Sequence, residues 1–326
     1  MKAVAYDGLG DESVLRIADV ASPELESGDL RIRVAAAAVN RADLLQRQGL
    51  YPPPPGASPI LGLECSGEVI EIGGQVEGWT PGDRAMALLS GGGYAEEVVV
   101  PAGCAMRVPE RLRWEEAAAV PEVFLTVFLN VFQLAGFADG EAALVHGGGS
   151  GIGTAAIQLV KAAGGAIIVT AGSDEKCRRC RELGADVAVN YRSGDFVEEA
   201  KSATGGRGVD VVLDSIGAPY LERNLAALRT GGFLILIGLM GGVRAEVNLA
   251  SLLTRRLHVI GSTLRARPVP EKTELIDAFS RRFGDALADG RVRPVVDRVV
   301  PLEQVAEAHR LMKASHHFGK IILRVS

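Results

Sequence analysis

The apolar positions follow two different rhythms along the chain, and the change falls near Pro121. Before that residue, short apolar runs alternate with turns rich in glycine and proline, at residues 2–7, 30–39, 65–73, 82–89 and 94–101. Runs of this length, bounded by turn residues, are typical of strands. The cluster YPPPPGASP at 51–59 predicts an irregular loop, because proline fixes φ and lacks a backbone N–H. The first part of the chain is therefore predicted to be β-rich and barrel-like.

After Pro121, short apolar runs are separated by amphipathic segments. A helical stretch over 121–137 leads to six such runs, at 142–146, 166–170, 187–190, 209–214, 233–238 and 258–261. Strands that alternate with helices in this way indicate a parallel, doubly wound sheet. An amphipathic helix over 272–288 then leads to two last strand-like runs, at 295–301 and 320–325. We expect these two strands to rejoin the first domain.

Composition narrows the class of protein. A chain of 326 residues has room for two domains. Its net charge of −5 argues against a partner with a phosphate backbone, so no nucleic acid is expected. No apolar run reaches the roughly 18 residues of a membrane helix, and the N-terminus lacks the pattern of a signal peptide. We therefore expect a cytoplasmic location and no membrane partner.

The four cysteines do not suggest a disulfide framework in a chain of this size. Cys177 and Cys180 form a C-x-x-C pair within a predicted helix. We interpret them as buried thiols one turn apart, with a redox or metal role as the alternative.

Five glycines occupy seven positions, 147–153, between the run at 142–146 and a helical segment. Gly151-x-Gly153-x-x-Ala156 fits the form of a dinucleotide-binding loop. Gly151 would let the chain turn, and Gly153 would let the backbone approach a pyrophosphate without a Cβ in the way. The N-terminus of the following helix offers free N–H groups to the phosphates. The loop therefore predicts dinucleotide binding.

The end of the second strand of this domain bears on which dinucleotide is bound. An NAD site usually carries an acid there, whereas the strand at 166–170 runs into Ala171, Gly172 and Ser173. Ser173 and Lys176 would suit the 2′-phosphate of NADPH. The acids at 174 and 175 could repel that phosphate, and Lys176 could be a solvated helix lysine. We expect NADPH, with NADH as the alternative.

Several motifs together resemble those of one family. They are NRADLLQRQGLYPPPPGASPILGLECSGEV at 40–69, the glycine loop, TAGSDEK, NYR, GLMGG and FGKIIL. The chain resembles the medium-chain dehydrogenase/reductase superfamily, and within it the zeta-crystallin-type NADPH:quinone oxidoreductases. The resemblance implies an α/β fold in which a doubly wound parallel Rossmann sheet (123–265) is inserted in a β-rich GroES-like catalytic domain (1–122 plus 266–326).

The resemblance also implies positions for the cofactor. It puts Ser150, Gly151 and Ile152 at the pyrophosphate, Ser173, Lys176 and Tyr191 around the adenosine 2′-phosphate, and Thr126, Gly238, Leu239, Met240 and Leu264 at the nicotinamide. The alternatives without a functional role are that Tyr191 is a surface aromatic residue and that Met240 only packs against neighbouring residues.

Asn40, Asp43 and Tyr51 fall where the family shapes its substrate pocket, and we take them as the candidate catalytic residues. Asn40 and Asp43 could instead cap a helix that begins at residue 41.

No metal site is expected. Zinc alcohol dehydrogenases of the superfamily use a His-Glu pair and cysteines to hold the catalytic ion, and the corresponding pair here is Leu63-Glu64. Cys65 beside Glu64 cannot supply three or four ligands alone. We interpret Glu64 as a buried, hydrogen-bonded residue.

Without a Lewis acid, an acceptor that takes hydride readily is favoured. We therefore expect an NADPH-dependent, zinc-independent quinone reductase. The alternatives are a reductase of enone or enal double bonds, for which Tyr51 would donate a proton to carbon, and an NADPH-binding structural or nucleic-acid-binding protein. An edge strand at 258–261 could pair across a dimer axis, which suggests a homodimer.

Overall fold

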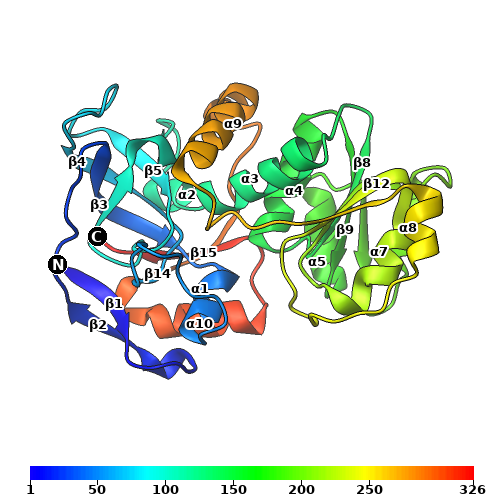
Figure 1. Ribbon diagram of the computed structural model, residues 1–326, viewed down its shortest axis with the longest axis horizontal. Coiled ribbons are helices and arrows are strands. Elements are labelled where there is room, and N and C mark those ends of the chain that lie inside the picture. Colours follow the sequence, from blue (N-terminus) through cyan, green and yellow to red (C-terminus); the bar gives the residue numbers. More distant parts are fainter. The chain divides into compact units, whose positions relative to one another are not determined.

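The computed structural model describes all residues, 1–326, and its chain divides into two compact units. Unit 1 comprises Met1–Leu125 and Leu264–Ser326, and unit 2 comprises Thr126–Thr263 (Figure 1). The middle of the chain thus forms one unit, while two segments far apart in sequence form the other.

Unit 1 is built around a seven-stranded sheet with the order β14-β15-β3-β4-β5-β7, in which β6 also pairs with β3. Its strands are β3 (Asp29–Ala38), β4 (Glu64–Ile72), β5 (Arg84–Leu88), β6 (Glu97–Pro101), β7 (Ala105–Arg107), β14 (Val296–Pro301) and β15 (Lys320–Arg324). A separate hairpin pairs β1 (Lys2–Tyr6) with β2 (Leu15–Asp19). Alternate residues of β3, namely Leu30, Ile32 and Val34, enter the core, as expected of a half-buried strand.

The helices of unit 1 are α1 (Arg41–Arg47), α2 (Trp114–Ala117), the first part of α3 (Pro121–Val127), α9 (Val269–Asp289) and α10 (Val305–Ala314). The strand β15 pairs antiparallel with β3 and parallel with β14. The last strand of the chain therefore lies inside the sheet rather than at its edge, and Lys320 begins it.

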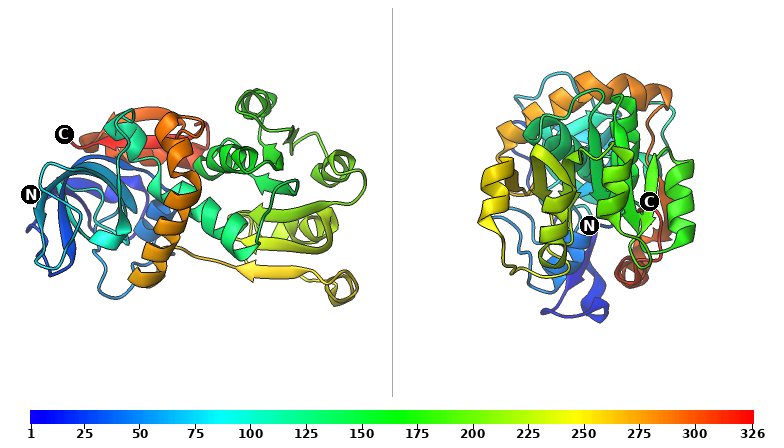
Figure 2. Two further views of the ribbon diagram at one scale, coloured as in Figure 1. Left: turned by 90° about the horizontal axis from the view of Figure 1, so that it is seen from above. Right: turned by 90° about the vertical axis from the view of Figure 1, so that its right-hand side faces the viewer.

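Unit 2 is a six-stranded, fully parallel sheet with the order β10-β9-β8-β11-β12-β13. Its strands are β8 (Ala142–His146), β9 (Ala166–Ala171), β10 (Val187–Asn190), β11 (Val209–Asp214), β12 (Leu228–Leu236) and β13 (His258–Gly261). The helices between them are α4 (Gly151–Ala162), α5 (Asp174–Glu182), α6 (Phe196–Ala203), α7 (Leu221–Ala227) and α8 (Leu249–Arg255). The strand β13 and the helix α8, yellow in Figure 2, lie at one edge of this sheet. The predicted doubly wound Rossmann sheet is confirmed.

One helical segment, Trp114–Leu134, is long and apolar enough to cross a membrane by length and composition, contrary to the sequence-based expectation. Within its most apolar window, 83% of the segment is buried inside the fold, as in the core helix of a globular protein. The segment is also divided, because α2 ends at Ala117 and α3 passes at Val127 into a π-helix, Phe128–Leu134.

The loop between β8 and α4 makes its turn at a different glycine from the one predicted. Gly147 has a φ of 78°, whereas Gly151 is already the first residue of α4. A Cβ at Gly153 would lie 2.4 Å from the carbonyl oxygen of Gly147 and 2.4 Å from the Cα of Gly148. Gly153 is therefore needed for the loop to pack against its own helix.

We predict that Gly153→Ala lowers the free energy of unfolding by about 1–3 kcal/mol, because the Cβ meets backbone atoms that cannot rotate away. The matched control is Gly284→Ala in α9, where a Cβ meets nothing within 4 Å. This control should stabilise the protein by about 0.5–1 kcal/mol through helix propensity. Urea denaturation measures both values, and wild-type stability for Gly153→Ala would contradict the packing argument.

Candidate functional site

The N-terminus of α4 presents backbone donors that suit a pyrophosphate. Ser150 caps the helix, and its Oγ accepts a hydrogen bond from the N–H of Gly153 at 3.0 Å. The N–H groups of Gly151 and Ile152 belong to the first turn and have no acceptor within the helix. Two free donors at the positive end of a twelve-residue helix fit an anionic group.

The N-terminus of α5 brings together the residues predicted for the adenosine end. The Oγ of Ser173 accepts a hydrogen bond from the N–H of Lys176 at 3.3 Å, so both residues lie in the first turn. The ring of Tyr191, 43% exposed, covers Gly172, where a Cβ would lie 2.6 Å from the Tyr191 hydroxyl. Ser173, Lys176 and Tyr191 therefore lie together at the carboxyl end of β9.

The two acids beside these residues are paired with other groups. The side-chain amide of Asn190 donates to Asp174 Oδ1 at 2.8 Å, and Arg178 pairs with Glu175 at 2.8 Å. A carboxylate that already has a partner repels a nearby phosphate less than a free one does. Asp174 and Glu175 therefore repel a 2′-phosphate less than the sequence alone suggested.

The residues predicted for the nicotinamide lie in separate places. Gly238, Leu239 and Met240 follow β12, and the N–H of Met240 donates to the carbonyl of Ser215 at 3.2 Å. Leu239 and Met240 are 48% and 57% exposed at the carboxyl end of the parallel strands, where ligands bind in such sheets. Thr126 of α3 is buried in unit 2, and Leu264 is buried in unit 1.

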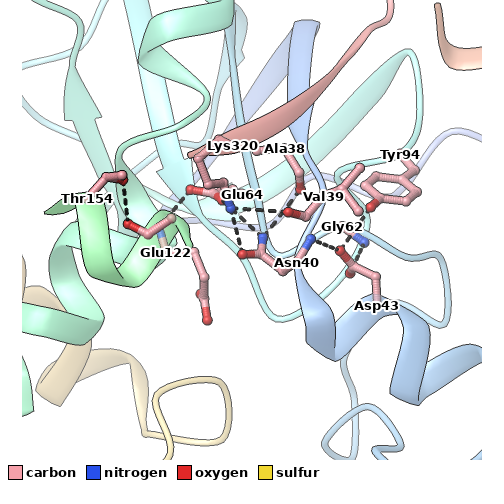
Figure 3. Close-up of polar contacts among 11 residues, drawn as sticks. Ala38, Val39, Asn40, Asp43, Gly62, Glu64, Tyr94, Glu122, Thr154 and Lys320 are labelled. Atoms are coloured by element: carbon pink, nitrogen blue, oxygen red, sulfur yellow. Dashed lines mark hydrogen bonds and ion pairs between the residues drawn. The ribbon is translucent and has the colours of Figure 1, made fainter. Parts of the chain in front are cut away.

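Asp43 in unit 1 is fully buried and accepts three hydrogen bonds (Figure 3). The donors are the N–H of Asn40 at 2.7 Å, the N–H of Gly62 at 3.1 Å and the hydroxyl of Tyr94 at 2.9 Å. Burial raises the pKa of Asp43 to about 6 in spite of these donors. Its carboxylate thus joins the start of α1 to two loops. The hydrogen bond from the N–H of Asn40 is part of a helix cap, which is the alternative role that the sequence offered for these two residues.

Asn40 completes a buried ionic group (Figure 3). The ammonium of Lys320 lies 2.7 Å from Glu64 Oε1, and it also donates to Asn40 Oδ1 at 2.7 Å and to the carbonyl of Val39 at 3.2 Å. The side-chain amide of Asn40 donates to the same Glu64 oxygen at 3.0 Å. Lys320 therefore neutralises the charge of Glu64. The sequence alone did not identify a partner for this carboxylate.

Glu122, at the start of α3, touches this group through its backbone. Its N–H donates to Glu64 Oε2 at 2.8 Å, while its own carboxyl oxygen Oε2 is buried and has no hydrogen-bond partner. Burial, and then the charge of Glu64, raises the pKa of Glu122 to about 8. Burial therefore favours the neutral form of this carboxyl group.

Arg265, which the sequence did not single out, contacts Tyr51. The guanidinium of Arg265 lies 5.4 Å from the centre of the Tyr51 ring and donates to the carbonyl of Tyr51 at 3.3 Å. Arg265 also donates to Gln46 Oε1 at 2.7 Å and to the carbonyl of Ser90 at 2.9 Å. Burial raises the pKa of the Tyr51 phenol. The proline-rich loop is thus fixed to α1 by one buried cation.

The donor groups near Glu64 do not form a metal site. No group of three or more histidine, cysteine, aspartate or glutamate side chains is arranged to hold an ion. Burial raises the pKa of the Cys65 thiol, which keeps it in the form that does not bind metals. The ammonium of Lys320 is the cation that pairs with Glu64.

The sequence did not single out Lys320, Glu122 and Arg265, which take part in these contacts of unit 1. Lys320 belongs to the quoted motif FGKIIL, whose charged residue at the start of an apolar strand marks its position but not its partner. Glu122 and Arg265 flank the predicted domain boundaries, where no periodic pattern marks a single residue.

Known families and proteins match both units. Residues 26–110 match the family model of the alcohol dehydrogenase GroES-like domain, and residues 151–281 match that of the zinc-binding dehydrogenase. The chain is 30% identical over 326 residues to a quinone oxidoreductase of Lama guanicoe, covering 99% of this chain and 97% of the relative. It is 32% identical to a synaptic vesicle membrane protein VAT-1 homolog of Danio rerio, covering 92% of this chain but only 65% of that relative.

Solved structures match over the whole chain. An NAD-dependent alcohol dehydrogenase is 36% identical with a TM-score of 0.87, and an Escherichia coli quinone oxidoreductase complexed with NADPH is 28% identical with a TM-score of 0.87; both comparisons cover 100% of each chain. The CurK enoyl reductase is 26% identical with a TM-score of 0.86, covering 100% of this chain and 99% of the other. With its GroES-like unit, its parallel Rossmann unit and a quinone oxidoreductase relative matched over 97% of its length, the chain belongs to the medium-chain dehydrogenase/reductase superfamily.

Proposed function

We propose that this protein is a zinc-independent oxidoreductase that uses NADPH to reduce quinones. The observation that carries the proposal is the pairing of Glu64 with the ammonium of Lys320. An ammonium has no vacant orbital and cannot polarise a carbonyl as a Lewis acid does. The acceptor must therefore take hydride without such help, as a quinone or another conjugated carbonyl compound does.

NADPH is the proposed cofactor. Ser150, Gly151 and Ile152 would hold the pyrophosphate, and Ser173, Lys176 and Tyr191 the adenosine 2′-phosphate. The Escherichia coli quinone oxidoreductase complexed with NADPH supports this choice, and the neighbour named NAD-dependent keeps NADH as the alternative. When bound, the cofactor supplies two electrons and a hydrogen nucleus as hydride.

The residues of unit 1 would then receive and orient the acceptor. Tyr51 offers a flat ring for stacking and a phenol donor for an oxygen that gains negative charge. Arg265 keeps the backbone and ring of Tyr51 in place, so little entropy is lost when the acceptor binds. Asn40 and Asp43 would shape the pocket through the contacts that fix the start of α1.

A reductase of enone or enal double bonds is the second candidate. The likeness to the CurK enoyl reductase favours it, and the Tyr51 phenol would then deliver its proton to carbon. An NADPH-binding structural or nucleic-acid-binding role is a weaker alternative, since the net charge of −5 disfavours nucleic acid.

We also propose that the protein is a cytoplasmic homodimer. The four buried cysteines are free thiols, as is usual in a reducing compartment.

For the dimer, β13 is the last strand of its sheet, and exposed apolar residues lie near it in sequence, with Leu253 79% and Val259 43% exposed. An edge strand of this kind can pair with its own copy across a two-fold axis. Sedimentation equilibrium should give twice the chain mass, and Val259→Lys should shift the protein toward monomer. A wild-type monomer at micromolar concentration would contradict the dimer.

We predict that Lys176→Ala weakens NADPH binding by about 1–3 kcal/mol and leaves NADH binding nearly unchanged, because only NADPH carries the 2′-phosphate. The matched control is Lys161→Ala in the same unit, which removes a lysine that pairs with Asp186 at the surface. Calorimetric titration with both cofactors measures the difference. Equal losses for NADPH and NADH would refute the assignment of Lys176.

We predict that NADPH oxidation is fastest with quinones and survives dialysis against a strong chelator. In this assay Tyr51→Phe should lose at most about tenfold with quinones, or roughly 1.4 kcal/mol, because hydride acceptance needs no obligatory proton. An enal reductase would lose about 10²–10⁴-fold with the same variant. If Tyr51→Phe and Tyr51→Ala both match wild type with every acceptor, Tyr51 lies outside the pocket.

A further inference from the structure

Four buried side chains of unit 2 form a polar network at the carboxyl ends of its central strands. Thr170 lies in β9, His146 ends β8, Asn224 belongs to α7 and Asp214 ends β11. The Oγ1 of Thr170 lies 3.0 Å from Nδ1 of His146, and Nε2 of that ring lies 2.7 Å from Oδ1 of Asn224. The amide nitrogen of Asn224 then donates to Asp214 Oδ2 at 3.0 Å. The four side chains are thus linked in series.

The hydrogen atoms of the polar network follow from the chemistry of its carboxylate end. Asp214 also accepts hydrogen bonds from two backbone N–H groups, so its carboxylate acts only as an acceptor. The amide of Asn224 therefore turns its nitrogen to Asp214 and its oxygen to His146. Burial lowers the pKa of His146 to about 4, so the ring is neutral and carries one N–H, at Nε2. Its Nδ1 then accepts from the hydroxyl of Thr170, and every polar atom of the four side chains has a partner.

One end of the polar network holds the glycine loop, residues 147–153. The Oγ1 of Thr170 accepts a hydrogen bond from the N–H of Gly147 at 3.4 Å, and the carbonyl of Thr170 accepts from the N–H of Gly148 at 2.7 Å. His146 directly precedes the loop in the sequence. The glycine loop is therefore tied to β9 as well as to β8, which leads into it.

The other end of the polar network holds the turn after β11, residues 215–217. Asp214 accepts two N–H groups of this turn, at 2.6 and 3.1 Å. Two carbonyls of the same turn accept the N–H groups of Met240 and Gly241, at 3.2 and 2.8 Å. Through this turn the polar network reaches the loop after β12, which contains residues predicted for the nicotinamide.

The position of the polar network in the sheet is the one where such folds bind ligands. In the order β10-β9-β8-β11-β12-β13, successive strands are added on one side from β8 to β10 and on the other side from β11 to β13. Ligands of such sheets bind beyond the carboxyl ends of the strands, at this reversal. The polar network joins β9 and β8 on one side of the reversal to β11 on the other. It therefore opposes a displacement of one side relative to the other.

We propose that the polar network positions NADPH indirectly, because it keeps the glycine loop and the loop after β12 at a fixed separation. This role rests on the proposed function, in which the first loop holds the pyrophosphate and the second loop the nicotinamide. The four side chains are positioning residues, since they are buried and act through the backbone of the two loops. When both loops are already in place, binding does not have to align them, and this preorganisation increases the affinity.

Two substitutions that break the polar network at different links test this role. Thr170→Val replaces the hydroxyl with a methyl group of similar size, and Asn224→Leu removes the amide. Each variant should weaken NADP⁺ binding by about tenfold, because buried partners lose their hydrogen bonds and the loops must be aligned on binding. The fragment 2′,5′-ADP lacks the nicotinamide and does not need the second loop, so its affinity should stay within about twofold of wild type. Calorimetric titration measures both affinities. Thr170→Val alone decides the comparison if Asn224→Leu does not fold, since valine suits a buried strand.

The double variant Thr170→Val/Asn224→Leu tests whether the side chains act as one network. Links in series fail together, so the double variant should lose about tenfold in NADP⁺ affinity, as either single variant does. Two independent residues would instead give a loss of about a hundredfold. The control is Gln158→Leu, which removes another buried amide of unit 2, one that donates to the carbonyl of Thr154 at 2.9 Å. It should keep the wild-type affinity for both ligands.

The outcomes separate this role from the proposed function. If no acceptor oxidises NADPH, quinone reduction fails, but the titrations with NADP⁺ and 2′,5′-ADP still decide the role of the polar network. If NADP⁺ does not bind to wild type, the cofactor site fails and the positioning role fails with it. If NADP⁺ binds wild type and both variants equally, the positioning role is overturned and the function stands. Equal losses for NADP⁺ and 2′,5′-ADP, or additive losses in the double variant, overturn it as well, because those results describe separate structural residues.

Discussion

The buried contact between Lys320 and Glu64 is the interaction on which the arrangement of unit 1 depends. Lysine has three N–H donors, and all three are used, by Glu64, Asn40 and the carbonyl of Val39. Glu64 in turn accepts from Asn40 and from the backbone of Glu122. These contacts tie β15, β4, the start of α1 and the start of α3 to one point. Removing one partner of such a pair usually costs about 3–5 kcal/mol, because the other charge remains buried.

The same contact bears on the chemistry proposed for this site. A metal ion at a carboxylate draws electron density from a bound carbonyl, whereas an ammonium with three fixed acceptors has no donor left for substrate. In the proposed function, the polarising group left for an acceptor is therefore the phenol of Tyr51. The N–H groups of Arg265 are likewise occupied, because they donate to Gln46 and to the carbonyls of Ser90 and Tyr51. In the proposed function, Arg265 therefore positions Tyr51 and does not bind the acceptor itself.

The sequence predicted unit 2 well because its central strands β8, β9 and β11 are buried on both faces and leave continuous apolar runs, such as the one at 142–146. It could not tell which glycine makes the turn, since several adjacent glycines offer the same freedom, and the structure puts the positive φ at Gly147. The helix α10 was missed because its buried face includes Ala308 and His309, which give a weak apolar signal. The role of Lys320 was beyond reach because its partner Asn40 lies 280 residues away. Sequence pattern reports local periodicity, whereas the buried contacts of Lys320 and Arg265 join residues far apart in the sequence.

The position of β15 has a consequence for the order in which the chain can fold. Unit 2 is continuous from Thr126 to Thr263, so all its strands leave the ribosome before β15 is made. The sheet of unit 1 needs residues 320–324 between β14 and β3, and until then β3 presents an open edge. Contacts of such long sequence separation form slowly, because the entropy of closing the loop must be lost first. During synthesis the Rossmann unit is therefore able to form first, and the GroES-like sheet closes around the last strand to emerge.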